Sequence, residues 1–411
     1  MPSQSRSFLT SLAAYGASEV AAKASRLLVL ALVARTLDLA VVGAAAAALA
    51  VGDILKALTE NGVGQRIIAA SDDAVEATCA TAHRIFWVWC TGLFVAQSGL
   101  AGLLYVINVD PLLAGLILLM GVEYLFMPAG LVQVALAMRA GKLKQTAAIG
   151  GAQVVGANFA SILLILVWPS SVALVLPRVL SAPIWLIAVR RLHPWERSGT
   201  GRAPLAPFLQ YGWAVLGVEV VKTLRLQADK IIVGATLGAE TLGLYFMAFN
   251  AGLSLSNAFT NALSTVLFPI LARSSDRVQS ARHVLLMGIV LISPLVLLQA
   301  ALVPVYVPFL FGEGWSGIEH LVQILCLLAI PTTLWATAAS WLRNHDRPQV
   351  EFAITAALAI AVSANALLLG PMGLDLLVLG YAVTTTALMC AASFGVLRPA
   401  LFSTANKRVT P

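Results

Sequence analysis

Charged residues are scarce in this sequence. They make up 11% of its 411 residues, whereas 59% are apolar and the mean hydropathy is +0.89. Soluble globular proteins carry about 25% charged residues. The composition therefore excludes a soluble globule, and also a globule with one anchor, and it predicts a chain that crosses a membrane many times.

Cysteine and histidine are also few, and neither forms a pattern. The four cysteines lie at or within apolar segments without paired spacing, which argues against a disulfide or a zinc site. The five histidines form no metal-ligand cluster, and there is no nucleophile elbow or ATP-binding motif. We therefore expect no enzyme, no metal and no cofactor. Transport would then use an H⁺ or Na⁺ gradient, the membrane potential or downhill flow of the substrate.

Twelve apolar segments are long enough to be membrane helices. They are 10–34, 44–64, 84–107, 112–137, 146–168, 172–189, 208–236, 242–268, 284–310, 316–341, 351–369 and 375–396. The fold class predicted is an all-α polytopic membrane protein with two pseudo-symmetric six-helix bundles around a central cavity. The bundles are residues 1–190 and 207–411, joined by a polar cytoplasmic linker at 191–206.

The basic residues predict the orientation of the chain. Most of the 26 fall in loops on one side of the predicted spans, while Arg35 alone lies in a loop on the other side. Because cytoplasmic loops are enriched in Lys and Arg, both termini are predicted to be cytoplasmic. The same bias explains the net charge of +7 without a nucleic-acid partner. Glu19, Lys23 and Arg26 interrupt the first apolar segment, so we expect no cleavable signal peptide.

The stretch from Glu219 to Tyr245 has an earlier counterpart in the chain. With an offset of 200 residues, Gly43 aligns with Gly243, and Gly52 with Gly252. Glu19-Val20 aligns with Glu219-Val220 in the same register. The offset carries no reversal of hydropathy, so it predicts a parallel repeat about an axis along the membrane normal.

Both copies of the repeat begin with a charged helix. In the second copy the charges occupy one sector of roughly 140° on a helical wheel. A charge at mid-membrane costs about 2.5–3.5 kcal/mol or more, so such residues must face protein or water. The predicted segments hold seven basic residues: Lys23, Arg26, Lys56, Arg178, Lys222, Arg225 and Lys230. We predict that these line a polar cavity and bind an anionic head group, because both side chains suit phosphate.

Six acidic residues inside the segments are candidates for ion coupling or for charge pairing: Glu19, Asp53, Glu60, Glu123, Glu219 and Asp229. The alternative to substrate binding is internal pairing, of Glu19 with Lys23, Glu219 with Lys222 and Arg225 with Asp229. Glu123 has no basic neighbour in sequence, so either it is neutral or, more simply, it makes an interhelical hydrogen bond. Arg178 follows Pro177, where the helix is expected to break. Its side chain either lines the cavity or extends to the membrane–water interface.

Two stretches resemble a known family. The first is LLVLALVARTLDLAVVGAAAAALA at Leu27–Ala50, followed by LTENGVGQRII at Leu58–Ile68. The second is ADKIIVGATLGAETLGLYFMAFN at Ala228–Asn250, with VLFPILARSSD after it. Both resemble bacterial polysaccharide-biosynthesis flippases of the O-antigen type, in the multidrug/oligosaccharidyl-lipid/polysaccharide exporter superfamily.

The resemblance implies two six-helix bundles that work by alternating access. The implied substrate is an undecaprenyl-diphosphate-linked glycan, moved from the inner to the outer leaflet of the bacterial inner membrane. Lys23, Arg26, Lys222 and Arg225 would meet its diphosphate. Membrane lipids are implied as partners, with a polysaccharide polymerase and glycosyltransferases as further candidates. The chain lacks the two additional helices typical of the peptidoglycan-precursor branch.

Other function classes stay open on the sequence. One is a cation-coupled multidrug exporter, although intramembrane lysines and arginines would repel a cationic drug. Another is a non-transporting scaffold of a polysaccharide assembly complex, for which an uncharged cavity would be better suited. A sugar polymerase is disfavoured because no long external loop is present.

Overall fold

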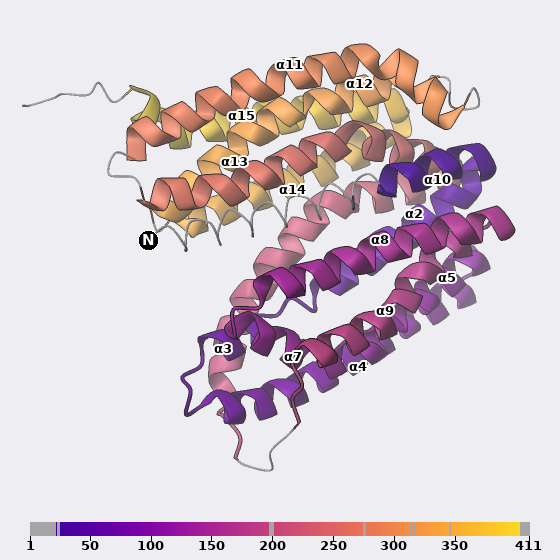
Figure 1. Ribbon diagram of the computed structural model, residues 1–411. Helices are drawn as coiled ribbons and strands as arrows, with labels where there is room; N and C mark the ends of the chain where they lie inside the picture. Colours follow the sequence, from indigo (N-terminus) through magenta and orange to yellow (C-terminus); the bar gives the residue numbers. More distant parts are fainter. Residues whose placement is uncertain are drawn as a thin grey trace, which may run out of the picture. The chain divides into compact units, whose positions relative to one another are not determined.

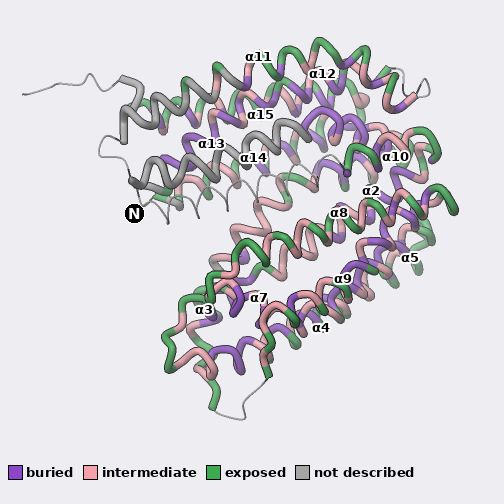
Figure 2. The backbone as a smooth tube through the Cα atoms, in the orientation of Figure 1, coloured by how far each residue is buried: buried purple, intermediate pink, exposed green. Residues whose placement is uncertain are grey.

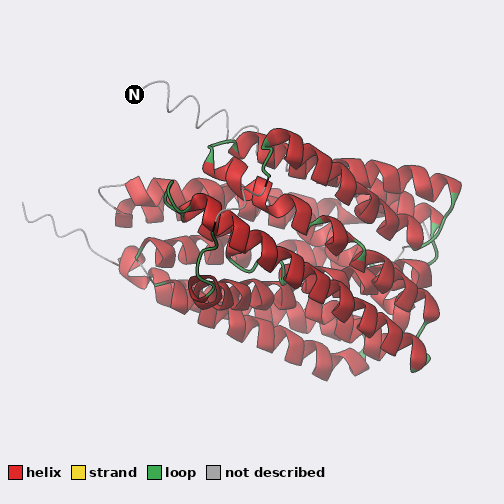
Figure 3. Cartoon of the chain, turned by 90° about the horizontal axis from the view of Figure 1, so that it is seen from below, coloured by secondary structure: helices red, strands yellow, loops and turns green. Residues whose placement is uncertain are grey.

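The computed structural model describes residues 22, 25–196, 201–273, 277–312, 315, 317–345 and 347–402. Between 254 and 285 it describes the backbone alone. All regular structure in these ranges is helical (Figure 3). The helices group into two units, Met1–Phe246 and Met247–Pro411.

The first unit begins with a helix over residues 25–36. It continues with α2 Leu39–Ala57, α3 Val63–Ala69, α4 Val75–Val106, α5 Pro111–Gly121, α6 Glu123–Phe126, α7 Pro128–Arg139, α8 Leu143–Val167, α9 Val172–Leu192 and the beginning of α10 Ala206–Arg273 (Figure 1). The second unit holds the rest of α10 and α11 Arg277–Phe311, α12 Glu319–Leu327, α13 Ala329–Asn344, α14 Pro348–Leu369, a 3₁₀ turn Gly370–Met372 and α15 Leu374–Phe402.

The boundary between the units differs from the polar linker predicted at 191–206. The first arm of α10 follows that linker in sequence but packs within the first unit. The chain entering it is held there by a hydrogen bond from Thr81 Oγ1 to the Ala203 carbonyl, at 2.9 Å. Further along, Gln227 Nε2 donates to Asp53 Oδ2 at 3.0 Å. A polar loop marks where the chain leaves the membrane, and packing decides which helices form one unit.

Nine of the described helices are long and apolar enough to cross a membrane, or ten if the bent pair Pro111–Phe126 and Pro128–Arg139 is one span. That pair bends by 54° at Pro128, which has no N–H to continue the helix. The break predicted at Pro177 is wrong, since α9 runs through Pro177 and Pro183. The chain is a multi-pass membrane protein, as predicted.

Along α8 only Ser161 and Ile165 are buried, and Figure 2 shows most of the helix as intermediate or exposed. Its exposed residues include Leu163, Leu166 and Val167. Apolar side chains on an exposed helix surface are typical of a membrane span. The core lies on the other helices, around the alanine-rich α2, where Ala44 and Ala48 pack with Leu116, Ile117 and Met120 of α5.

A break at Gly238 divides α10 into two arms. Its φ of 84° and ψ of 174° are open to glycine but strained for other residues. The first turn beyond the break packs against the beginning of α2. A side chain at Gly43 would collide with the Ala239 carbonyl oxygen, and one at Gly243 with the Leu39 carbonyl oxygen. Gly43 and Gly243, like Leu39 and Ala239, are 200 residues apart. This reciprocal contact is what a two-fold-related pair of repeats produces.

The contact at Gly43 can be tested by adding one methyl group. Gly43→Ala is expected to lower the free energy of unfolding by about 1–3 kcal/mol, because a backbone carbonyl stands where the Cβ would lie. The matched control is Gly99→Ala on α4, where nothing lies within 4 Å of an added Cβ. At that position the substitution should be neutral or stabilising, because alanine has a higher helix propensity than glycine. The free energy of unfolding of each purified variant in detergent measures the two effects. Equal destabilisation by Gly43→Ala and Gly99→Ala would contradict the close approach of the backbones at Gly43.

Candidate functional site

Four charged side chains and one amide form a network inside the first unit. Asp53 and Lys56 lie one turn apart on α2, Glu123 begins α6, and Arg178 lies in α9. Arg178 Nη1 donates to Asp53 Oδ1 at 2.7 Å, and its Nε lies 3.5 Å from Glu123 Oε2. Lys56 Nζ pairs with Glu123 Oε1. Gln227 of α10 completes the network through its hydrogen bond to Asp53.

Glu123 is the centre of this network and is only 4% exposed. Two basic groups contact it, Lys56 and Arg178, although neither is near Glu123 in sequence. The interhelical hydrogen bond weighed for Glu123 is present, because Lys56 donates to it from α2. A carboxylate this buried needs such partners, since an unpaired buried charge is very costly.

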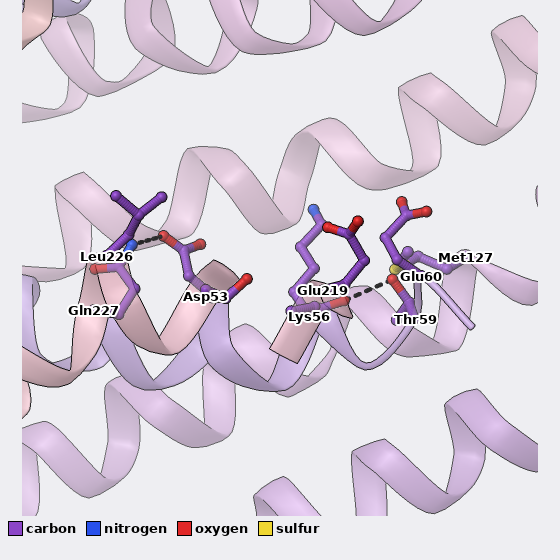
Figure 4. A pocket seen from close by; sticks show the side chains of 10 residues that line it. Asp53, Lys56, Thr59, Glu60, Met127, Glu219, Leu226 and Gln227 are labelled. Atoms are coloured by element: carbon purple, nitrogen blue, oxygen red, sulfur yellow. Dashed lines mark hydrogen bonds between the residues drawn. The ribbon is translucent and has the colours of Figure 1, made fainter. Parts of the chain in front are cut away.

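A pocket of about 330 Å³ opens beside the network. Its polar lining comes from the end of α2 and the turn after it, and from the first arm of α10: Asp53, Lys56, Thr59, Glu60, Glu219, Thr223 and Gln227 (Figure 4). Its apolar lining is Ala57, Met127 and Leu226. The α10 residues share one face because their spacing of three and four matches the helical period. The pocket is of the size that takes part of a large ligand.

The basic residues around the pocket are mostly paired. Lys222 Nζ donates to Glu219 Oε1 at 2.8 Å, one of the pairs predicted from spacing. Arg225, three residues on, has a buried Nε without a partner and forms no ion pair within the described part of the chain. Arg26 is exposed on helix 25–36, where the charges of Asp53 and Arg178 act on it, and no described residue pairs with it. Neither of these two guanidinium groups therefore forms an ion pair with a described residue.

A second charged cluster lies deeper in α10. Asp229 is 1% exposed and accepts a hydrogen bond from the Tyr245 hydroxyl at 2.5 Å, and its Oδ1 lies 3.4 Å from Lys230 Nζ. Lys230 also donates to the Leu226 carbonyl. The predicted pairing of Arg225 with Asp229 is wrong, because Asp229 points to Tyr245 on the other side of Gly238. Asp229 and Lys230 do not line the pocket.

The structure thus brings together Asp53, Lys56, Glu60, Glu123, Arg178, Glu219 and Lys222 at one place, while Asp229 and Lys230 form a separate ion pair close enough for the charge of Asp53 to act on Lys230. Glu19 and Lys23, and their predicted pairing, lie outside the described residues. The sequence analysis missed Thr59, Thr223, Gln227 and Tyr245. The helical spacing of Thr223 and Gln227 from Glu219 could have revealed the first arm's polar face. Nothing local links Tyr245 to Asp229.

No group of three or more His, Cys, Asp or Glu side chains among the described residues could hold a metal ion. The carboxylates at the pocket come from α2, the turn after it and α10. Asp53 and Glu219 contact basic groups, whereas Glu60 forms no ion pair with a described residue.

Comparison with known proteins gives a family match and several relatives. The family model described as "Polysaccharide biosynthesis protein" matches residues 32–320. The amylovoran biosynthesis protein AmsL of Erwinia amylovora is 28% identical over 148 residues, which are 35% of this chain and 38% of AmsL. The lipopolysaccharide biosynthesis protein WzxC of Escherichia coli (strain K12) is 26% identical over 154 residues, 36% of this chain and 31% of WzxC. The matched part is therefore well under half of each relative's length.

Solved structures with the same fold include two transporters. The lipid II flippase MurJ in an inward closed conformation matches with a TM-score of 0.76 and 11% identity, over 94% of this chain and 87% of MurJ. An inward-facing multidrug resistance transporter of the MATE family, in the MOP superfamily, matches with a TM-score of 0.70 and 11% identity, over 93% of this chain and 96% of that one. At this identity the likeness shows the fold alone, and it confirms the predicted fold class.

Proposed function

Because the chain belongs to the polysaccharide biosynthesis protein family, we propose that it is a flippase for a lipid-linked oligosaccharide. The substrate we propose is a polyprenyl-diphosphate-linked glycan, moved from the inner to the outer leaflet of the bacterial inner membrane by alternating access. The names of AmsL and WzxC, which both refer to polysaccharide biosynthesis, support this class of substrate. The fold shared with the flippase MurJ supports the mode of action.

The observation that carries the anion-binding part of the proposal is the pair of available guanidinium groups. Arg26 and Arg225 have no counter-ion among the described residues, while Lys56, Arg178, Lys222 and Lys230 have one. An arginine without a counter-ion can bind phosphate through two parallel hydrogen bonds. We therefore assign the diphosphate to Arg26 and Arg225, with Lys23 as a further candidate from the sequence.

Several finer parts of the proposal come from the sequence alone. The orientation with both termini in the cytoplasm follows from the distribution of basic residues. Coupling to an H⁺ or Na⁺ gradient or to the membrane potential, and association with a polymerase and glycosyltransferases, are predictions of the same kind. We expect no catalytic activity of the chain itself.

Translocation in proteoliposomes tests the proposal. Wild type is expected to move a labelled polyprenyl-diphosphate oligosaccharide between leaflets, and the double variant Arg26→Ala plus Arg225→Ala to be at least about tenfold slower. Hydrogen bonds to charged groups are worth about 1.5–3 kcal/mol each, and the double variant removes several of them. Arg84→Ala, an exposed arginine of α4, is the matched control and should leave the rate unchanged.

The alternatives give different results in this assay. Translocation that survives the double variant would keep the flippase and remove these arginines from the diphosphate site. Absence of wild-type translocation with the native glycan would contradict the flippase. It would leave the multidrug exporter, whose fold the chain shares, or the assembly scaffold.

A further inference from the structure

We propose that the pocket beside the ion network binds a neutral or amine-bearing sugar of the substrate, and that it rejects the diphosphate and acidic sugars. This inference rests on the proposed function and divides the substrate between two places. Arg26 and Arg225 bind the diphosphate, and the pocket binds one part of the glycan.

The basic groups at the pocket already form ion pairs with carboxylates. Lys56 pairs with Glu123, Arg178 lies 2.7 Å from Asp53 and 3.5 Å from Glu123, and Lys222 lies 2.8 Å from Glu219. A diphosphate could bind here only by separating one of these pairs, which would leave a partly buried carboxylate without its counter-ion. Arg225 does not line the pocket. It lies about 145° around the helical wheel from the centre of the face that does.

The charge of the pocket lining disfavours a second anion as well. Three carboxylates face the pocket, from Asp53, Glu60 and Glu219, against the one basic side chain of Lys56. Asp53 and Glu219 have counter-ions, whereas Glu60 forms no ion pair with any described residue. Like charges at close range repel strongly where water is partly excluded. A carboxylated sugar is therefore unfavourable beside Glu60, and an ammonium or a hydroxyl group is favourable.

The remaining lining groups suit a polyhydroxylated ring. Thr59 Oγ1 donates to the Lys56 carbonyl at 2.7 Å, so its lone pairs stay free to accept from a ligand. Gln227 uses its Nε2 on Asp53 and keeps its Oε1 as an acceptor. Thr223 adds another hydroxyl, and Met127 and Leu226 offer apolar surface for the C–H face of a sugar. Figure 4 shows Glu60 and Thr59 at one end of the pocket and Gln227 at the other.

The volume and position of the pocket fit one part of a glycan. At about 330 Å³ it is at the small end of ligand pockets, too small for a whole oligosaccharide. In the predicted topology, residues 53–60 lie almost entirely in the cytoplasmic half of the span 44–64, and residues 219–227 lie around the middle of the span 208–236. A substrate loaded from the cytoplasm would therefore reach the pocket before it crosses to the outer side.

The test compares three substrates that share one polyprenyl diphosphate and differ in one sugar: a neutral hexose, a hexosamine with a free amine and a hexuronic acid. Wild type in proteoliposomes is expected to move the first two and to move the acidic one at least about tenfold more slowly. Glu60→Gln removes the unpaired carboxylate while keeping the shape of the side chain. It should reduce the discrimination several-fold, measured as the ratio of the neutral to the acidic rate within one preparation.

The matched control is Glu240→Gln, an exposed carboxylate on the other arm of α10 that should leave the discrimination intact. Equal wild-type rates for all three substrates would keep the flippase and overturn the assignment of the pocket. A preference that Glu60→Gln leaves unchanged would also overturn it. Translocation of none of the three would overturn the proposed function itself, together with this inference.

Discussion

Replacing Arg178 with methionine is expected to lower the free energy of unfolding by about 3–5 kcal/mol, which is the usual cost of removing one partner from a buried ion pair. Arg178 joins α9 to Asp53 of α2 and to Glu123, which is 4% exposed. Methionine fills a similar volume but leaves the two carboxylates with only Lys56 and Gln227. Denaturant-induced unfolding in detergent, followed by circular dichroism, measures the change.

The control for Arg178 is a pair of the same chemistry with more exposure. Lys222 and Glu219 have side chains that are 44% and 32% exposed, so Lys222→Ala should cost about 1 kcal/mol or less. Equal destabilisation by the two substitutions would mean that the buried network around Glu123 contributes no more to stability than an exposed ion pair does. A large loss for Arg178→Met alone would support it.

Replacing Asp229 with leucine is also expected to lower the free energy of unfolding by about 3–5 kcal/mol, because it leaves the buried ammonium group of Lys230 without its carboxylate. Asp229 and Lys230 are 1% and 5% exposed. The substitution also removes the acceptor of the Tyr245 hydroxyl, whose 2.5 Å hydrogen bond joins the two arms of α10 across Gly238. Unfolding is measured as for Arg178.

A second substitution separates charge from packing at Asp229. The double variant Asp229→Leu plus Lys230→Met removes both charges, so it should be more stable than Asp229→Leu alone. Tyr245→Phe, which removes only the hydroxyl, should cost about 1.5–3 kcal/mol because the bond is to a charged group. A double variant less stable than the single one would show that Lys230 does not depend on Asp229.

Much of this fold follows directly from the composition. Long apolar segments and few charges predict the helices, and the described helices α2 to α15 overlap the predicted segments from 44–64 to 375–396. The glycine coincidences of the repeat anticipated the reciprocal contact of Gly43 and Gly243. Glycines at equivalent positions mark equivalent close approaches of backbone, so they remain visible where other identities are lost.

The pairing of the charges could be predicted only where it is local. Glu219 and Lys222 pair because they are one turn apart on one helix. Arg225 and Asp229 have equally good spacing and do not pair. Asp229 instead meets Tyr245, which the Gly238 break folds back onto it. Sequence spacing predicts which residues share one face of a helix. Which of these residues form an ion pair or a hydrogen bond depends on the side chains that pack against that face.

Composition alone establishes that the chain crosses the membrane many times and which side chains are too polar to face lipid, because the cost of a charge in hydrocarbon depends on residue type. The position of Glu123 between Lys56 and Arg178, which are 67 and 55 positions away, is visible only once the helices are packed. The tertiary structure also decided that Arg26 and Arg225 keep no counter-ion among the described residues. Such long-range pairs form when separate helices pack, and no local pattern encodes them.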